Sequence, residues 1–335
     1  FRAELERYEK RSRQVLRRVN KANAAHYTFD SIVAVSPRSA ACRELASRLA
    51  QTDVTVLLQS ESGTGKELYA QAIHNASPRS AGVFVAINCA NFNANMLESE
   101  LFGYTEGAFT GAKRGGKIGL FEAAAGGTLF LDEIGNLSLP MQSKLLTAIE
   151  KRHITRLGAV EPISIDVRLI CATNANLRQL VGEGSFRQDL LYRINTIEIA
   201  IPPLRERGED ILMLADHFQR LYSRKYKKTI KGLSREAGSK LMKYPWPGNV
   251  RELQHVLERA VILNEGTVLR PDDFPLYTAS YERKKELDPD LNLEQAERKI
   301  IERALRQSNG NMSYAAELLG ITRFSLYRKI EKFGL

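Results

Sequence analysis

Residues 54–66 read Val54-Thr-Val-Leu-Leu-Gln-Ser60-Glu-Ser-Gly-Thr-Gly-Lys66, and the order of residue types in this segment predicts a strand, a turn and a helix. The apolar run from Val54 to Leu58 predicts a short buried strand. The small residues that follow predict a turn with inward-pointing backbone N–H groups, and a lysine then opens a helical pattern. Such a strand, turn and helix are typical of phosphate-binding loops, where the helix adds the positive end of its dipole.

Two residues depart from the usual pattern of a phosphate-binding loop. Ser60 stands where glycine is expected, and Glu67 stands where serine or threonine is expected. A side chain at position 60 is tolerated if φ is negative, whereas Gly63 and Gly65 lie nearer the expected phosphate path. A chance glycine-rich turn before a helix is the alternative. We expect nucleotide contacts from the whole turn, namely Ser60, Glu61, Ser62, Gly63, Thr64, Gly65, Lys66 and Glu67.

A second strand end carries two adjacent acids, in Thr128-Leu-Phe-Leu-Asp132-Glu133. Asp132 is expected to hold Mg²⁺, directly or through water, and Glu133 to orient and deprotonate an attacking water. Acids after a strand are common, so this signal is weak alone. Because it follows the phosphate-binding turn by about 65 residues, it indicates the Walker B motif of a nucleotide hydrolase.

The remaining pattern predicts an α/β fold with a mainly parallel sheet, followed by helical parts. Further strands are expected at Val83–Ile87, Val167–Ala172 and Ile197–Ile201, separated by helical segments. Pro202 and Pro203 end this region. We expect a connector helix at 1–24, an α/β nucleotide-binding subdomain at 25–203, a helical lid at 204–265, a linker at 266–291 and a small helical domain at 292–335.

Composition limits the class of protein. The 335 residues are 26% charged and 43% hydrophobic, without an apolar run long enough for a bilayer, so no membrane segment is expected. Cys42, Cys89 and Cys171 form no paired spacing, which favours a reducing cytoplasm over a zinc or disulfide framework. The chain starts at Phe1 without a signal-peptide pattern, so an upstream regulatory domain is expected to be missing.

The last residues predict a DNA-binding helix-turn-helix. Helices are expected at Leu293–Ser308, Ser313–Leu319 and Thr322–Phe333, with a tight turn at Gly320-Ile321 and a buried stripe of Ile321, Leu326 and Ile330. The net charge of +10 favours a polyanionic partner, although solubility alone would also explain it. A bundle that serves only dimerisation is the alternative. The third helix offers Thr322, Arg323, Ser325, Tyr327, Arg328 and Lys329 to double-stranded DNA.

The segment Gly107-Ala-Phe-Thr-Gly-Ala112, preceded by Glu98-Ser-Glu-Leu-Phe-Gly103, resembles one family. From about Phe29 to Leu335 the sequence is similar to the bacterial enhancer-binding proteins, the AAA+ activators of sigma-54 RNA polymerase, with a Fis-type helix-turn-helix. The resemblance implies that Gly107, Ala108, Phe109, Thr110, Gly111 and Ala112 contact sigma-54. A glycine-flanked loop with a buried phenylalanine is the alternative from residues alone.

The same resemblance implies roles for other polar residues. Asn88 matches the switch residue that holds the catalytic glutamate, and Thr173 and Asn174 match sensor I, although a strand-end Asn can simply cap a turn. Arg187 and Arg193 match arginine fingers that enter the neighbouring subunit's site, with surface ion pairs as the alternative. Arg251, in Trp246-Pro-Gly-Asn-Val-Arg-Glu252, matches sensor II.

The predicted protein is therefore a sigma-54-dependent activator that uses ATP and Mg²⁺. Its expected partners are sigma-54 RNA polymerase, an upstream DNA site and further copies of itself, from a dimer to a hexameric or heptameric ring. Two alternatives stay open. Ser60 motivates a DNA-binding regulator with weak nucleotide binding that acts by occupancy, and a AAA+ remodeller of other proteins is the third hypothesis.

Overall fold

The computed structural model describes residues 25–276, 293–308 and 311–335. The chain divides into two compact units, residues 1–275 and 276–335, and each is described by itself. The predicted connector helix at 1–24 and residues 277–291 of the predicted linker lie outside the described residues. In the described ranges, no helix has the length and apolar character needed to cross a membrane.

A five-stranded parallel sheet forms the centre of the first unit, in the spatial order β2-β5-β8-β1-β9. This confirms the predicted α/β class, and each predicted strand end lies within two residues of the observed one. The residues of β8 are buried throughout, because helices cover both faces of the sheet and a parallel strand then needs continuous apolar residues. The strands are β1 (Val56–Gln59), β2 (Phe84–Asn88), β5 (Thr128–Asp132), β8 (Arg168–Thr173) and β9 (Ile197–Ala200).

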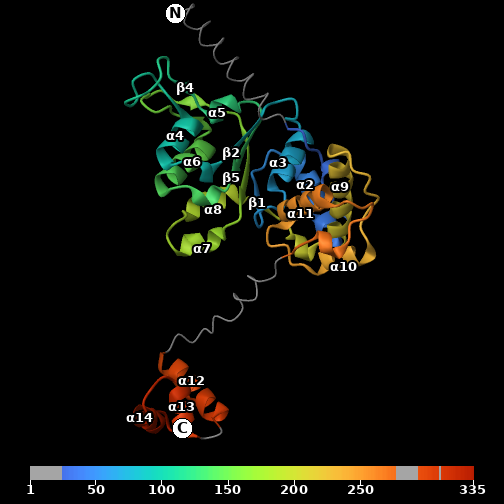
Figure 1. Ribbon diagram of the computed structural model, residues 1–335. Coiled ribbons are helices and arrows are strands. Elements are labelled where there is room, and N and C mark those ends of the chain that lie inside the picture. Colours follow the sequence, from blue (N-terminus) through green and yellow to red (C-terminus); the bar gives the residue numbers. More distant parts are fainter. Residues whose placement is uncertain (1–24, 277–292, 309–310) are drawn as a thin grey trace, which may run out of the picture. The chain divides into compact units, whose positions relative to one another are not determined.

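Helices form a layer on each side of this sheet (Figure 1). On one side, Leu101, Leu145 and Leu190 join Leu129 and Leu131 of β5 in one apolar cluster. A second cluster on the other side contains apolar residues of α2 and α3 together with alternate residues of β1 and β5. The helices of the first side are α4 (Ala94–Phe102), α5 (Leu120–Ala123), α6 (Leu139–Lys151), α7 (Leu177–Gly182) and α8 (Gln188–Ile194), and those of the second are α2 (Pro37–Ala50) and α3 (Lys66–Asn75).

Two short antiparallel hairpins, which the sequence did not predict, interrupt the α/β alternation. One pairs β3 (Gly103–Tyr104) with β4 (Lys117–Ile118), and the other pairs β6 (His153–Ile154) with β7 (Ile163–Ser164). A parallel bridge joins the hairpins, in which Thr105 N donates to Leu157 O and Leu157 N donates to Gly103 O, both at 3.0 Å. The loop between β3 and β4 projects away from the sheet in Figure 1.

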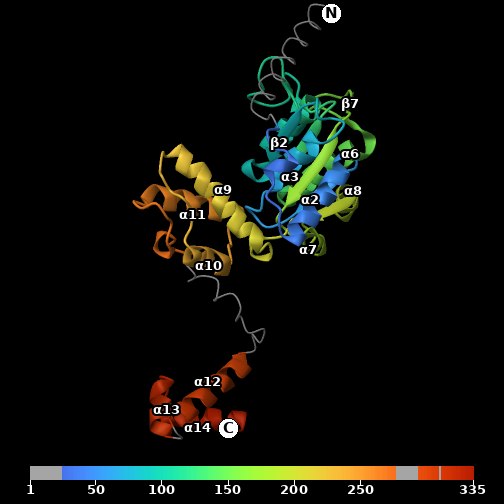
Figure 2. The ribbon, with the colours of Figure 1, turned by 90° about the vertical axis from the view of Figure 1, so that its right-hand side faces the viewer.

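The helical lid consists of α9 (Glu209–Lys225), α10 (Arg235–Lys243) and α11 (Asn249–Leu263), with short 3-10 turns η4 (Leu204–Glu206) and η5 (Pro271–Asp273). Figure 2 shows α9 and α11 side by side. The indole of Trp246 is fully buried against Tyr244 and donates to Leu241 O, which anchors the predicted break between α10 and α11. The predicted linker, residues 266–291, was wrong for residues 266–275. Leu269 and Phe274 are fully buried, so the folded unit continues to Pro275.

The second unit is the predicted helix-turn-helix, with α12 (Leu293–Gln307), α13 (Met312–Leu318) and α14 (Arg323–Phe333). Its small core contains Ile301, Ala315, Ala316 and Leu326. Of the predicted buried stripe only Leu326 is fully buried, whereas Ile321 and Ile330 are half-buried, because three short helices cannot cover a whole helix face. Gly320 adopts a left-handed φ of 62° in the turn before α14.

Candidate nucleotide-binding site

The turn between β1 and α3 has the backbone of a phosphate-binding loop. Gly63 and Gly65 have φ values of 79° and 106°, a region that favours glycine, and Gly65 directly precedes α3. A Cβ on Gly63 would lie 2.4 Å from the backbone oxygen of Gly248 in the lid. The left-handed backbone therefore favours glycine at both positions. At Gly63 there is also no room for a side chain beside the lid.

Ser60 is accommodated within the loop without strain. Its φ is not positive, and its side chain is buried with Oγ 2.6 Å from Thr64 Oγ1. Thr64 Oγ1 in turn donates to the backbone oxygen of Glu61. The hydroxyl thus stabilises the turn from inside, and the serine fits the loop without a left-handed backbone.

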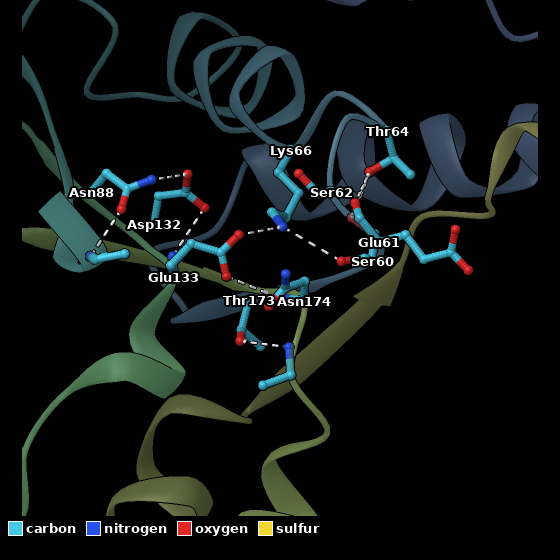
Figure 3. Close-up of polar contacts among 12 residues, drawn as sticks. Ser60, Glu61, Ser62, Thr64, Lys66, Asn88, Asp132, Glu133, Thr173 and Asn174 are labelled. Atoms are coloured by element: carbon cyan, nitrogen blue, oxygen red, sulfur yellow. Dashed lines mark hydrogen bonds and ion pairs between the residues drawn. The ribbon is translucent and has the colours of Figure 1, made fainter. Parts of the chain in front are cut away.

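The lysine of the loop faces the acidic strand end (Figure 3). Lys66 Nζ lies 3.1 Å from Glu133 Oε1 and also donates to the backbone oxygen of Ser60. Glu133 Oε2 accepts a hydrogen bond from the backbone N–H of Asn174 at 3.2 Å. Glu133 has a left-handed φ of 53°, a conformation that is costly outside glycine.

Asp132 lies beside this pair and is held by two donors. Its Oδ1 accepts from the backbone N–H of Glu133 at 3.0 Å, and its Oδ2 accepts from Asn88 Nδ2 at 3.1 Å. Burial is the largest cause of a raised pKa of the Asp132 carboxyl, which Lys66 opposes and Glu133 reinforces. A bound cation would favour the charged form of this carboxylate.

The resemblance implied that Asn88 holds Glu133, but in this structure its side chain has a different partner. Its amide instead bonds Asp132, while its Oδ1 accepts from Ala90 N and caps the 3-10 turn η2 (Cys89–Asn91). The reason is the register of the parallel pair, which places Asn88 directly opposite Asp132.

The residues at this sheet edge fit Mg²⁺ held together with a triphosphate. Among the described residues no group of three or more His, Cys, Asp or Glu side chains could enclose a metal ion. Mg²⁺ needs no such cage, since it is commonly bound by one or two carboxylates together with substrate phosphates and water. Asp132 supplies such a carboxylate. Glu67, exposed on the first turn of α3, accepts a hydrogen bond from Gln71.

The lid meets the phosphate-binding loop directly. Arg251 Nη1 donates to Ser62 Oγ at 3.1 Å, which places this side chain beside the phosphate-binding loop. The sequence missed two further contacts. Arg205 forms a two-pronged ion pair with Glu61 at 2.6 and 2.9 Å and lowers the pKa of that carboxyl, and Asn249 Nδ2 donates to both Glu61 and the Ser62 backbone.

The two predicted arginine fingers do not join this site within one chain. Arg187 forms an ion pair with Asp189, at 2.6 Å, and donates to Ser143. The Arg193 side chain has no ion pair among the described residues and lines a separate cavity. A role for either at the γ-phosphate therefore requires a second copy of the chain.

The loop at 107–112 has a glycine with a left-handed backbone near each end. Gly107 and Gly111 have φ values of 79° and 96°, and a Cβ on either would meet open space. Phe109 is 45% exposed and packs edge-on against Tyr104, with ring centroids 5.0 Å apart. Phe109 is thus partly exposed to solvent and partly covered by Tyr104.

The third helix of the C-terminal unit presents most of its predicted DNA contacts to solvent. Arg323, Tyr327 and Arg328 are exposed, and Thr322 caps the helix by accepting from Ser325 N. Lys329 departs from the prediction, because it forms an ion pair with Glu297 of α12. Sequence reasoning missed Phe324, whose ring is 72% exposed beneath the guanidinium of Arg328.

Comparison with protein families matches nearly the whole described chain. Residues 32–200 match the sigma-54 interaction domain, residues 205–290 the AAA+ ATPase lid domain, and residues 292–333 the bacterial regulatory proteins of the Fis family. The three matches follow one another in chain order.

Individual relatives are similar over most of this chain. A signal-transduction and transcriptional-control protein of Clostridium beijerinckii is 44% identical over 93% of the chain and 50% of its own length. Nitrogen fixation protein AnfA of Azotobacter vinelandii is 43% identical over 95% of the chain, which spans 60% of that protein. The transcriptional regulatory protein ZraR of Escherichia coli is 45% identical, with 88% and 68% covered.

A solved structure has the same fold. The crystal structure of NtrX from Brucella abortus in complex with ATP superposes with a TM-score of 0.68 at 30% identity, over 91% of this chain and 70% of that one.

Proposed function

Since this chain belongs to the sigma-54 interaction domain family of AAA+ proteins, we propose that it is a sigma-54-dependent transcriptional activator. It binds an upstream DNA site and uses ATP hydrolysis, in a ring of its own copies, to remodel the closed complex of RNA polymerase. The convergence of Lys66, Asp132 and Glu133 at one sheet edge carries this proposal. The ATP complex of the related NtrX supports nucleotide binding by the same fold.

In the proposed reaction, each side chain of this edge has one task. Lys66 leaves Glu133 for the terminal phosphates, and the freed carboxylate orients the attacking water and takes its proton. Asp132 would hold Mg²⁺, which would supply neutralising charge to the phosphate oxygens. Asn174 positions Glu133 through its backbone N–H, and Asn88 positions Asp132.

Arg187 and Arg193 are supplied by the adjoining subunit in this proposal. Neither contacts the nucleotide site of its own chain, whereas a planar cation at the γ-phosphate stabilises the charge of the transition state. Hydrolysis then depends on assembly, so ATP turnover per subunit should rise with protein concentration. We propose a hexamer or heptamer as the working ring.

Replacement of Phe109 by alanine should impair the remodelling of polymerase without changing ATP hydrolysis. The exposed ring is the apolar contact of the projecting loop, and aromatic anchors contribute about 2 kcal/mol or more at an interface. We expect open-complex formation by purified sigma-54 polymerase to fall about thirtyfold, with ATP turnover unchanged.

The matched control is Met242→Ala, which truncates an exposed apolar side chain on the lid helix α10. This variant should form open complexes normally. Equal losses in both variants, or a parallel loss of ATP turnover in Phe109→Ala, would contradict the assignment of the loop to the polymerase contact.

Replacement of Arg328 by alanine should weaken binding to the upstream DNA site. If the guanidinium contacts a phosphate, the slope of log affinity against log salt falls by about one; if it reads a base, discrimination falls by about 1–3 kcal/mol. Arg306→Ala removes the same charge from the last turn of α12 and should change neither. An identical effect of both substitutions would indicate net charge alone and would refute the recognition role of α14.

A further inference from the structure

Phe324 is the most exposed large apolar side chain among the described residues of the C-terminal unit. Its ring is 72% exposed and does not belong to the apolar cluster that forms the core of this unit. Leu326, two residues further on, is fully buried in that cluster. Because two residues advance an α-helix by about 200°, Phe324 and Arg328 both project from the side of α14 opposite the core.

Three of the six predicted DNA contacts on α14 are engaged within the protein. Thr322 Oγ1 donates to Ser325 Oγ at 3.0 Å and accepts from the Ser325 N–H, so both hydroxyls serve the helix cap. Lys329 forms an ion pair with α12. The first residues of a recognition helix are those that reach base edges in the major groove. The exposed side chains in this part of α14 are Arg323, Phe324, Tyr327 and Arg328.

The guanidinium of Arg328 lies over the ring of Phe324, with Cζ 6.0 Å from the ring centroid. This cation–π contact restricts the orientation of a long side chain, so less conformational entropy is lost when the arginine binds a partner. A guanidinium held in one plane matches the O6 and N7 acceptors of guanine, which arginine contacts more often than any other base. The ring therefore influences where Arg328 can reach.

An apolar ring among cations fits one feature of double-stranded DNA. From Arg323 to Phe333, α14 carries four cationic side chains and one carboxylate, which favours a polyanionic partner. At Phe324 this partner must also offer an apolar group, because burial of the ring against phosphate oxygens would gain little. The apolar group that a base pair exposes in the major groove is the methyl group of thymine.

We propose that Phe324 determines sequence specificity by contacting the methyl group of a thymine, while Arg328 contacts a guanine one or two base pairs away. Successive base pairs are about 3.4 Å apart, so side-chain groups 6.0 Å apart reach pairs at that separation. This inference rests on the proposed binding of α14 to an upstream DNA site, and it adds the bases that the helix recognises.

The test starts from a DNA site that the full chain selects from a random pool of double-stranded oligonucleotides. Each thymine of this site is then replaced by deoxyuridine, which keeps the base pair and removes only the methyl group. We expect at least one thymine at which this replacement weakens binding about fourfold, the factor that corresponds to one buried methyl group. In Phe324→Ala the same replacement should have no effect, whereas Phe324→Leu should retain part of the discrimination.

A second replacement locates the guanine. 7-Deazaguanine lacks the N7 acceptor, so its introduction one or two base pairs from that thymine should weaken binding by the unmodified chain but not by Arg328→Ala. Ile300→Ala truncates another exposed apolar side chain, on α12, and should keep the full discrimination between thymine and deoxyuridine. Since Phe324 is exposed, its replacement should leave the thermal unfolding midpoint of the full chain unchanged.

The proposal is overturned if deoxyuridine has equal effects on the unmodified chain and Phe324→Ala at every thymine, or if Arg328→Ala keeps the response to 7-deazaguanine. A loss of affinity in Phe324→Ala that does not depend on the methyl group also overturns it, and assigns the ring to the DNA backbone or to a second copy of the chain. Failure of the chain to select any DNA site would instead refute the DNA binding on which the proposal rests.

Discussion

Replacement of Glu133 by glutamine is expected to lower ATP turnover by a factor of about 10²–10⁴, the usual contribution of a positioned general base. Glutamine keeps the size of the side chain and can still accept from the backbone N–H of Asn174. It cannot take a proton from water at neutral pH. The ion pair with Lys66 is lost as well, which leaves the lysine free for phosphate, so nucleotide binding should be retained or tightened.

Phosphate release at saturating ATP measures turnover, and binding of a fluorescent ATP analogue measures affinity. Glu150→Gln, an exposed carboxylate on α6, is the matched control and should leave both quantities unchanged. Retention of normal turnover by Glu133→Gln would exclude this carboxylate as the base. A large loss of affinity instead would mean that Glu133 serves the binding of nucleotide.

Replacement of Gly63 by alanine should disable the junction between the phosphate-binding loop and the lid. The substitution places a Cβ 2.4 Å from the Gly248 oxygen, a backbone atom that cannot rotate away. It also forces alanine into the left-handed region, at a cost of about 1–2 kcal/mol. We expect the lid to shift and ATP affinity to fall at least about tenfold.

Gly184→Ala is the control that separates the cost of the left-handed backbone from the overlap with the lid. Gly184 has a similar φ of 70° but open space around the added Cβ, so it carries the backbone cost without the overlap. Chemical denaturation should show that both variants lose unfolding free energy, because both force alanine into a left-handed backbone. Only Gly63→Ala should also lose ATP affinity. Full affinity in Gly63→Ala would show that the lid contact is not needed for nucleotide binding.

The parts of the site that were predictable are local in sequence or fixed by parallel pairing. A glycine-rich turn between an apolar strand and a helix specifies its own backbone, so Gly63, Gly65 and Lys66 could be placed from their spacing. Because the carboxyl ends of parallel strands meet at one sheet edge, Asp132 and Glu133 followed from their position after β5.

The missed contacts depend on tertiary distance. Nothing near Glu61 in the sequence indicates that Arg205 pairs with it, because the pair joins elements 144 residues apart. Asn249, two residues before Arg251, was also missed, because its complete burial and its hydrogen bonds to Glu61 and Ser62 appear only in the folded chain. For Lys329, helical periodicity placed it on the exposed face of α14 but could not show Glu297 of α12 beside it.

The backbone bridge between the two small hairpins has a mechanical consequence. Leu157 is hydrogen-bonded to Gly103 and Thr105 on the near side of the projecting loop, and a Cβ on Gly158 would come within 2.8 Å of Ala108. The loops that carry Phe109 and Val160 are thus joined at their bases by backbone hydrogen bonds. We therefore expect the two loops to move together when either of them is displaced.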